Sequence, residues 1–258
     1  MTAWIDSHCH LDSVIDLPGA LQRARAAGVR GMITVGTDLE TSRRAVEIAE
    51  SHEEVAAAVG VHPHEAAGFS SLDLDELVEL AGSKNVAALG EIGLDYYREL
   101  SPRSAQREAF HRQLKAAKEL DLAVVIHVRD AHEDLFAILE EVGPPPRLVF
   151  HCFSGGPEEA ARALALGGYV SFAGNISYKS AGVLREAASA VPPDHLLVET
   201  DSPYLAPMPV RGKPNEPALV PIVGAALAAA AGLPVEQVAE ETRENARRVF
   251  RLDAWVCG

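Results

Sequence analysis

The stretch Trp4-Ile5-Asp6-Ser7-His8-Cys9-His10 joins a short apolar run to two histidines near the start of the chain. In a β-strand, side chains two positions apart lie on the same face, so His8 and His10 are expected to point the same way. Two neutral imidazoles placed together in this manner are suited to binding a divalent metal ion. The stretch therefore predicts a strand that ends in a metal site.

Strand-like and helix-like segments alternate along the rest of the chain. Strands are predicted at residues 3–8, 29–35, 55–61, 86–91, 123–127, 147–151, 169–172 and 195–200. Helices are predicted at 18–27, 38–51, from Asp73 onward with Glu76 completing a capping box, and at 102–120, 132–142, 157–167, 180–190, 217–231 and 235–250. Repeating units of roughly 30 residues predict a single (β/α)₈ barrel domain over residues 1–258, with extra C-terminal helices. An open doubly wound sheet would need a glycine-rich turn after the first strand, and the sequence has none there.

Metal-capable side chains follow almost every predicted strand at its C-terminal end. They are His8, His10, His62, His64, Glu91, His127, His151, Glu199 and Asp201. In a parallel barrel these ends meet at one rim, where barrel enzymes carry their active sites. Histidine nitrogens and carboxylate oxygens are the ligands of hydrolytic metal sites, and Glu91 could bridge two ions through its two oxygens.

Composition limits the partners and the compartment. The chain has 23 Lys and Arg against 37 Asp and Glu, a net charge of −14, which argues against a protein that coats long nucleic acid. Cys9, Cys152 and Cys257 are too few for a disulfide framework. With no recognisable signal peptide and no apolar run long enough for a membrane span, we expect a cytoplasmic protein without membrane contact. Cys9 and Cys152 alternate with histidines, so we interpret them as small packing residues that face away from the site.

The same residues, together with their neighbours, resemble the TatD family of metal-dependent deoxyribonucleases, within the amidohydrolase-like barrel superfamily. The resemblance extends from the first strand to the end of the chain. The segments that carry it are Asp6–Asp12, Gly60–His64, Gly90–Tyr96, Val125–His127, His151–Gly155, Glu199–Leu205, Arg211–Pro217 and Asn245-Ala246.

The resemblance implies two divalent ions, which could be Mg, Mn or Zn. One would be held by His8, His10, Glu91 and Asp201. The second would be held by Glu91, His127 and His151. His62 and Tyr204 would contact the substrate, and the roles of Asp95, Glu199 and Arg211 are undefined. The family implies cleavage of DNA ends, as a 3′-to-5′ exonuclease on single strands and sometimes at damaged sites, and we expect a monomer.

We expect hydrolysis by water activated between the ions, with Asp201 orienting that water or accepting its proton and Glu91 bridging the ions. Arg129, Lys179, Arg211 and Lys213 could add local positive charge. The main alternative is an amidohydrolase or another ester hydrolase, acting on a lactone, a small phosphoester or an aminoacyl-tRNA ester. Many amidohydrolases use a carboxylated lysine as the bridge, where this chain has Glu91. A non-catalytic metal-binding scaffold would be expected to have lost ligands, and none is missing here.

Overall fold

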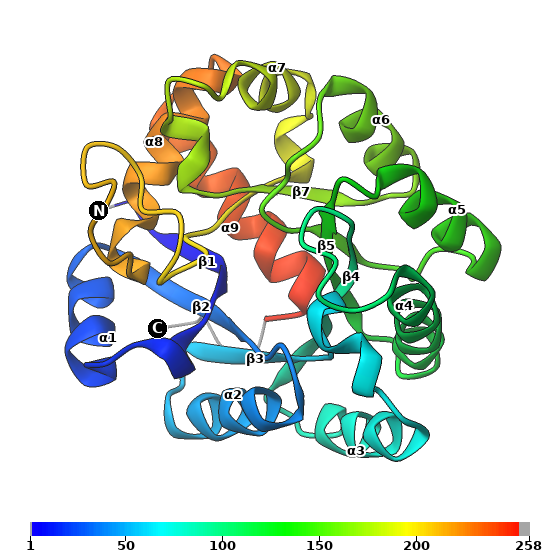
Figure 1. Cartoon of the computed structure of the whole chain (residues 1–258). Coiled ribbons are helices and arrows are strands. Elements are labelled where there is room, and N and C mark those ends of the chain that lie inside the picture. The colour runs from blue at the N-terminus through cyan, green and yellow to red at the C-terminus, as the bar shows by residue number, and fades with distance from the viewer. Residues whose placement is uncertain (1, 253–258) are drawn as a thin grey trace.

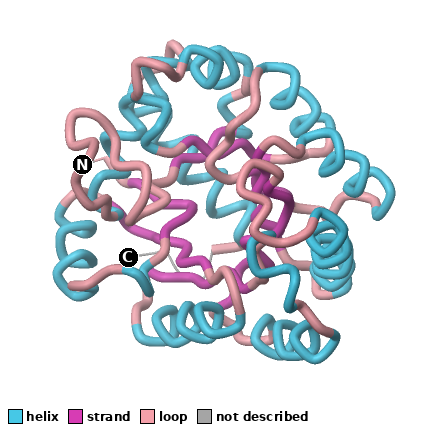
Figure 2. The backbone as a smooth tube through the Cα atoms, viewed as in Figure 1, coloured by secondary structure: helices cyan, strands magenta, loops and turns pink. Residues whose placement is uncertain are grey.

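Eight parallel strands form a ring inside a shell of helices (Figures 1 and 2). The computed structural model describes residues 2–252. The strands are β1 Trp4–Cys9, β2 Val29–Val35, β3 Val55–Val59, β4 Val86–Asp95, β5 Ala123–Arg129, β6 Leu148–Phe150, β7 Tyr169–Phe172 and β8 Leu196–Val198. They pair in sequence order from β1 to β8. The predicted (β/α)₈ barrel is confirmed.

A helix follows each of the first seven strands, and among the described residues two further helices follow β8. They are α1 Leu17–Ala26, α2 Leu39–Ser51, α3 Ser71–Ala81, α4 Arg103–Glu119, α5 His132–Val142, α6 Pro157–Ala165, α7 Gly182–Ala190, α8 Val220–Ala231 and α9 Val235–Phe250. The extra C-terminal helices, α8 and α9, are present as predicted. Among residues 2–252, no helix alone has both the length and the apolar composition of a membrane span. One pair, Pro217–Ala231 with Val235–Phe250, meets those two criteria jointly but is bent by 109°.

The barrel closes between β8 and β1 without a regular ladder among the described residues. The Asp201 N–H donates to the His8 carbonyl oxygen at 2.9 Å, and the His10 N–H donates to the Ser202 carbonyl oxygen at 2.8 Å. These bonds join β1 to the segment that follows β8. They therefore fix the first predicted histidines against the predicted carboxylate ligand from the far end of the sequence.

Apolar side chains pack on both sides of the strand ring. Phe110 of α4 and Leu227 of α8 belong to a large cluster between strands and helices. A second cluster inside the barrel joins Val125 of β5 to Val249 and Phe250 at the end of α9. Helix α9 is seen through the middle of the ring in red (Figure 1). Because apolar side chains fill this part of the interior, the polar groups gather at the carboxyl ends of the strands.

The predicted start of α3 is wrong. Ser70 is the N-cap, and its hydroxyl accepts a hydrogen bond from the Asp73 N–H at 3.2 Å. The Asp73 carboxylate accepts one from the Ser70 N–H at 2.6 Å. Asp73 is thus the third helical residue of a capping box, rather than the cap itself, and Glu76 instead pairs with Arg43.

Strands β4 and β5 run further than predicted, to Asp95 and Arg129. Their pairing continues through Gly93 opposite His127 and Asp95 opposite Arg129. A Cβ atom on Gly93 would lie 1.9 Å from the His127 carbonyl oxygen, and the φ of +148° also favours glycine, so this close pairing requires the absent side chain. Glu91 and His127 consequently lie within strands, below the rim.

Strands β3, β6 and β8 end earlier than predicted, at Val59, Phe150 and Val198. His62, His151 and Asp201 therefore belong to the loops that follow these strands. The metal-capable residues thus come from two levels, one inside the barrel and one on its upper loops.

Candidate metal centre

A cavity of about 730 Å³ opens at the carboxyl ends of the strands. Most of the predicted site residues line it: His10, His62, Glu91, His127, His151, Asp201 and Tyr204. His8 lies deeper and is fully buried. The structure therefore brings together all six predicted ligands and both predicted substrate contacts.

The first cluster surrounds the imidazole nitrogens of His8, in β1, and of His10, just past its end. The Nε2 atoms of His8 and His10 face each other at 3.3 Å. Asp201 Oδ1 lies 3.5 Å from the Nε2 of His10 and 3.8 Å from that of His8. Glu91 Oε2 lies 3.6 Å from His8 Nε2. Convergent nitrogen and carboxylate donors of this kind fit a divalent ion.

The second cluster surrounds the other oxygen of Glu91. Oε1 lies 2.6 Å from His127 Nδ1, 2.8 Å from His151 Nε2 and 3.4 Å from His62 Nε2. Glu91 thus directs one oxygen toward each cluster, which is the geometry expected of a carboxylate that bridges two ions. The Glu91 side chain is only 5 % exposed, so few water molecules compete for it.

Acceptors outside the clusters fix the orientation of two of these rings. His10 Nδ1 lies 3.1 Å from the Val35 carbonyl oxygen, which can only accept. His127 Nε2 lies 3.1 Å from Asp95 Oδ2. Each contact places the ring proton on the outer nitrogen, which leaves the lone pair of the inner nitrogen directed at the cluster.

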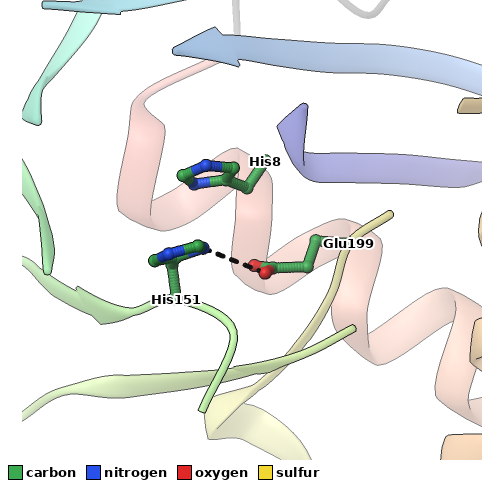
Figure 3. Close-up of side chains that lie close together, drawn as sticks. All are labelled: His8, His151 and Glu199. Atoms are coloured by element: carbon green, nitrogen blue, oxygen red, sulfur yellow. Dashed lines mark hydrogen bonds and ion pairs between the residues drawn. The ribbon is translucent and has the colours of Figure 1, made fainter. Parts of the chain in front are cut away.

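Glu199 holds His151 in the same way (Figure 3). Its Oε1 lies 3.1 Å from His151 Nδ1 and accepts from the Cys152 N–H at 2.8 Å. The His8 ring stacks on the His151 ring with centroids 3.8 Å apart. His8, His151 and Glu199 also lie close enough to bind an ion themselves. Because Glu199 needs the His151 Nδ1 proton, we interpret this group as support for the second cluster rather than as a third site.

Charge and burial set the protonation of the cluster. Burial and the nearby His151 hold the pKa of His8 well below its ordinary value, so this ring is neutral. Burial alone would raise the pKa of Glu91, but the charge of His151 and the hydrogen bonds from His127 and His151 outweigh it and lower that pKa well below the usual range. Burial would lower the pKa of His151, but Glu91 and Glu199 raise it well above its ordinary value. An ion that binds His151 must therefore displace a proton.

His62 is better suited to donate a hydrogen bond than to bind a metal. Its Nδ1 accepts a hydrogen bond from the His64 backbone N–H at 3.1 Å, and a backbone N–H can only donate. Burial lowers the pKa of His62 to about 4, so the ring is neutral and its single proton lies on Nε2. His62, Glu91 and His127 are close enough to surround an ion. However, the His62 Nε2 that faces Glu91 carries the ring proton, so it has no free lone pair for a metal. The geometry thus favours the predicted substrate contact.

Two buried glutamines on α4 support the site and were not predicted. Gln106 accepts from the Asp95 N–H at 2.8 Å and donates to the Asp95 and Ser101 carbonyl oxygens. Gln113 makes a matching pair of bonds to the backbone of Val61, next to His62. Their signal in the sequence is two amides seven residues apart on the apolar face of a helix. The resemblance left the role of Asp95 undefined, and the structure shows it as the acceptor for His127 and His64.

The remaining candidates differ in whether they line the cavity. Tyr204 is 58 % exposed, lines the cavity and lies with its ring centroid 5.8 Å from that of His10. Arg211 lies over the Tyr178 ring at 4.2 Å and is not among the described residues that line the cavity. Of the four cations suggested from the sequence, Arg129 lines the cavity.

The two cysteines differ from each other. Cys9 is fully buried, and its thiol donates to the Ile33 carbonyl oxygen, so it faces away from the site as predicted. The same prediction is wrong for Cys152. This residue lies past the end of β6 with a φ of 41° and lines the cavity, because the alternation of a strand no longer applies there.

A parallel barrel that gathers histidine nitrogens and carboxylate oxygens at the carboxyl ends of its strands has the architecture of a metal-dependent hydrolase. The chain belongs to the TatD family, whose sequence model, described as TatD related DNase, matches residues 5–251.

Relatives and a solved structure match over nearly the whole chain. The chain is 39 % identical over 252 residues to the uncharacterized metal-dependent hydrolase YabD of Bacillus subtilis, covering 96 % of this chain and 99 % of YabD. It is 40 % identical over 244 residues to the 3′-5′ ssDNA/RNA exonuclease TatD of Pantoea ananatis, covering 92 % of this chain and 94 % of that protein. The crystal structure of YJJV, a TatD homologue from Escherichia coli K12, superposes with a TM-score of 0.91 at 33 % identity, covering 96 % and 98 % of the two chains. The chain is therefore a metal-dependent hydrolase of the TatD family.

Proposed function

We propose that this hydrolase removes nucleotides from the 3′ ends of single-stranded DNA, with two divalent ions bound at the carboxyl ends of the strands. The observation that carries the proposal is the position of Glu91, whose two oxygens face two separate groups of histidines. Dinuclear centres are well suited to phosphodiesters, whose negative charge must be neutralised during attack. The exonuclease named in Pantoea ananatis supports this choice over a small ester.

The ligand assignment follows the two clusters. His8, His10, Asp201 and Glu91 would hold one ion, and Glu91, His127 and His151 would hold the other. The ions, which could be Mg, Mn or Zn, would polarise the scissile phosphate and lower the pKa of the attacking water. No further ligand is required, because both groups already combine nitrogen and carboxylate donors.

The protein's own groups would position the substrate and move the proton. The Asp201 carboxylate lines the cavity, where it would orient the attacking water or accept its proton. The Nε2–H of His62 would donate to a non-bridging phosphate oxygen. Tyr204, exposed at the cavity mouth, would contact the terminal nucleotide.

The acidic surface fits a limited contact with the DNA end. A net charge of −14 disfavours binding along a long strand, so the grip would come from the cavity. We further propose that the chain acts as one domain and as a monomer. A cytoplasmic location and a role in DNA repair stay predictions.

The test is release of nucleotides from single-stranded DNA labelled at its 5′ or 3′ end, with added magnesium or manganese. We expect metal-dependent, stepwise loss from the 3′ end by the wild type, and its loss in Glu91→Ala and His127→Ala. Matched controls are Glu108→Ala and His111→Ala on α4, which remove the same side-chain types outside the cavity and should leave the rate unchanged. Hydrolysis of amides or lactones, with phosphodiesters left intact by a folded and metal-loaded protein, would contradict the proposal.

A further inference from the structure

An exposed pair of side chains lies beside the cavity, outside the two metal clusters. Strands β4 and β5 remain paired up to Asp95 and Arg129, and the Tyr96 N–H then donates to the Arg129 carbonyl oxygen at 2.9 Å. This pairing brings the next residue, Tyr97, alongside Arg129. The Arg129 guanidinium carbon lies 3.8 Å from the centroid of the Tyr97 ring.

Neither side chain has an evident role in packing. Tyr97 is 60 % exposed, so its ring is open to a ligand. Arg129 is also exposed, and its guanidinium is held on the ring face by a cation–π contact. A guanidinium held in this way keeps its N–H donors on its edges, free to bind an anion.

The charge of the cavity adds a second, independent observation. Among the described residues that line the cavity, two are Lys or Arg, namely Arg98 and Arg129. Within residues 2–252, neither of these two side chains forms an ion pair, whereas Arg103 and Arg107 nearby pair with Glu99 and Asp134. An unpaired positive edge on an otherwise strongly acidic protein indicates a place for a phosphate.

We propose that Tyr97 and Arg129 bind the nucleotide that precedes the terminal one, with the Arg129 N–H groups on its phosphate and the Tyr97 ring against its base. This inference rests on the proposed function and specifies its substrate as a single-stranded polynucleotide rather than a small phosphoester. An exposed ring can stack only on an unpaired base, because both faces of a base within a duplex are covered by its neighbours.

The test is equilibrium binding of 5′-fluorescein-labelled pentathymidylate with phosphorothioate linkages, which resist cleavage, measured by fluorescence anisotropy with magnesium present. We expect Tyr97→Leu to raise Kd by about 5- to 150-fold, and Tyr97→Phe, which keeps the ring, to bind like the wild type. Arg129→Gln should reduce the slope of log K against log salt by about 0.7, the contribution of one phosphate on a single strand, while Tyr97→Leu keeps the slope. Arg162→Gln is the matched control. The Arg162 guanidinium carbon lies 4.2 Å from the centroid of the Phe136 ring, and Arg162 does not line the cavity.

A second arm measures magnesium- or manganese-dependent turnover of unmodified pentathymidylate and of bis(p-nitrophenyl) phosphate. We expect Tyr97→Leu and Arg129→Gln to raise KM for the oligonucleotide and to leave both constants for the small ester unchanged. Equal Kd and KM values in wild type and variants, or no oligonucleotide binding by the wild type, would overturn the inference. If the binding differences appear but the wild type cleaves neither substrate, the inference stands and the proposed function fails.

Discussion

Replacing Gln106 with leucine would remove the amide that fixes the backbone at the end of β4. The side chain is fully buried and makes three hydrogen bonds to backbone groups of Asp95 and Ser101. Leucine has a similar size but leaves one N–H and two carbonyl oxygens without this partner. A buried polar group left unpaired costs about 1–3 kcal/mol, so we expect the free energy of unfolding to fall by about 3–5 kcal/mol after local relaxation.

The loss should also reach the metal centre. Asp95 accepts from His127, and displacement of its backbone would loosen that ring beside Glu91. We therefore expect Gln106→Leu to weaken binding of the ion held by Glu91, His127 and His151 more than binding of the other ion. Urea unfolding gives the stability, and calorimetric titration with manganese gives the two affinities.

Glu108→Leu on the same helix is the control, since it introduces leucine at an exposed position and should change stability by no more than about 0.5 kcal/mol. An unfolding free energy for Gln106→Leu within about 1 kcal/mol of wild type would exclude this role of Gln106, because water or another group would then satisfy the backbone.

Three further predictions concern buried ionisable groups. Glu199→Gln should still unfold in one cooperative urea transition yet bind ions about 10- to 100-fold more weakly by calorimetry, because His151 loses the charge that orients it; unchanged affinity would exclude this role. Because Glu91 and Glu199 outweigh burial and raise the pKa of metal-free His151, ion binding should release a proton and weaken as the pH falls. Titrations in two buffers of different ionisation enthalpy measure that proton, and equal heats would contradict it. Burial, which outweighs two hydrogen bonds from Thr200, raises the pKa of Asp6 to about 8. A carboxyl whose pKa is raised on folding stabilises the fold only while it is protonated. The free energy of unfolding should therefore decrease as the pH rises from about 4, near the ordinary pKa of 3.8, to about 8, the pKa in the folded protein, and it should decrease less in Asp6→Asn.

The barrel could be predicted because each strand has a local sequence signal. His8 and His10 at the end of β1 and the apolar run of β5 are recognisable without any tertiary information. The ends of the strands were less predictable, because pairing partners rather than local sequence decide how far a strand continues. Gly93 shows the reason: its missing side chain lets β4 remain paired with β5 beyond Glu91.

The metal ligands could be predicted from the sequence, but the residues that position them could not. Six metal-capable residues lie at or just past the ends of predicted strands, and the fold brings them together. Gln106 and Gln113 could not be assigned from sequence, because nothing local shows which distant backbone groups a buried amide will bind. The tautomer of His62 likewise depends on a backbone N–H that only the folded loop positions. Cys152 was wrongly predicted because β6 ends two residues before it.

The most direct measurement of the dinuclear centre is an anomalous difference map from crystals of the protein soaked in manganese. We expect two peaks on either side of Glu91, one contacted by His8, His10 and Asp201 and the other by His127 and His151. His62 should contact neither ion. A single peak, or a peak coordinated by Glu199 or His62, would contradict the proposed centre.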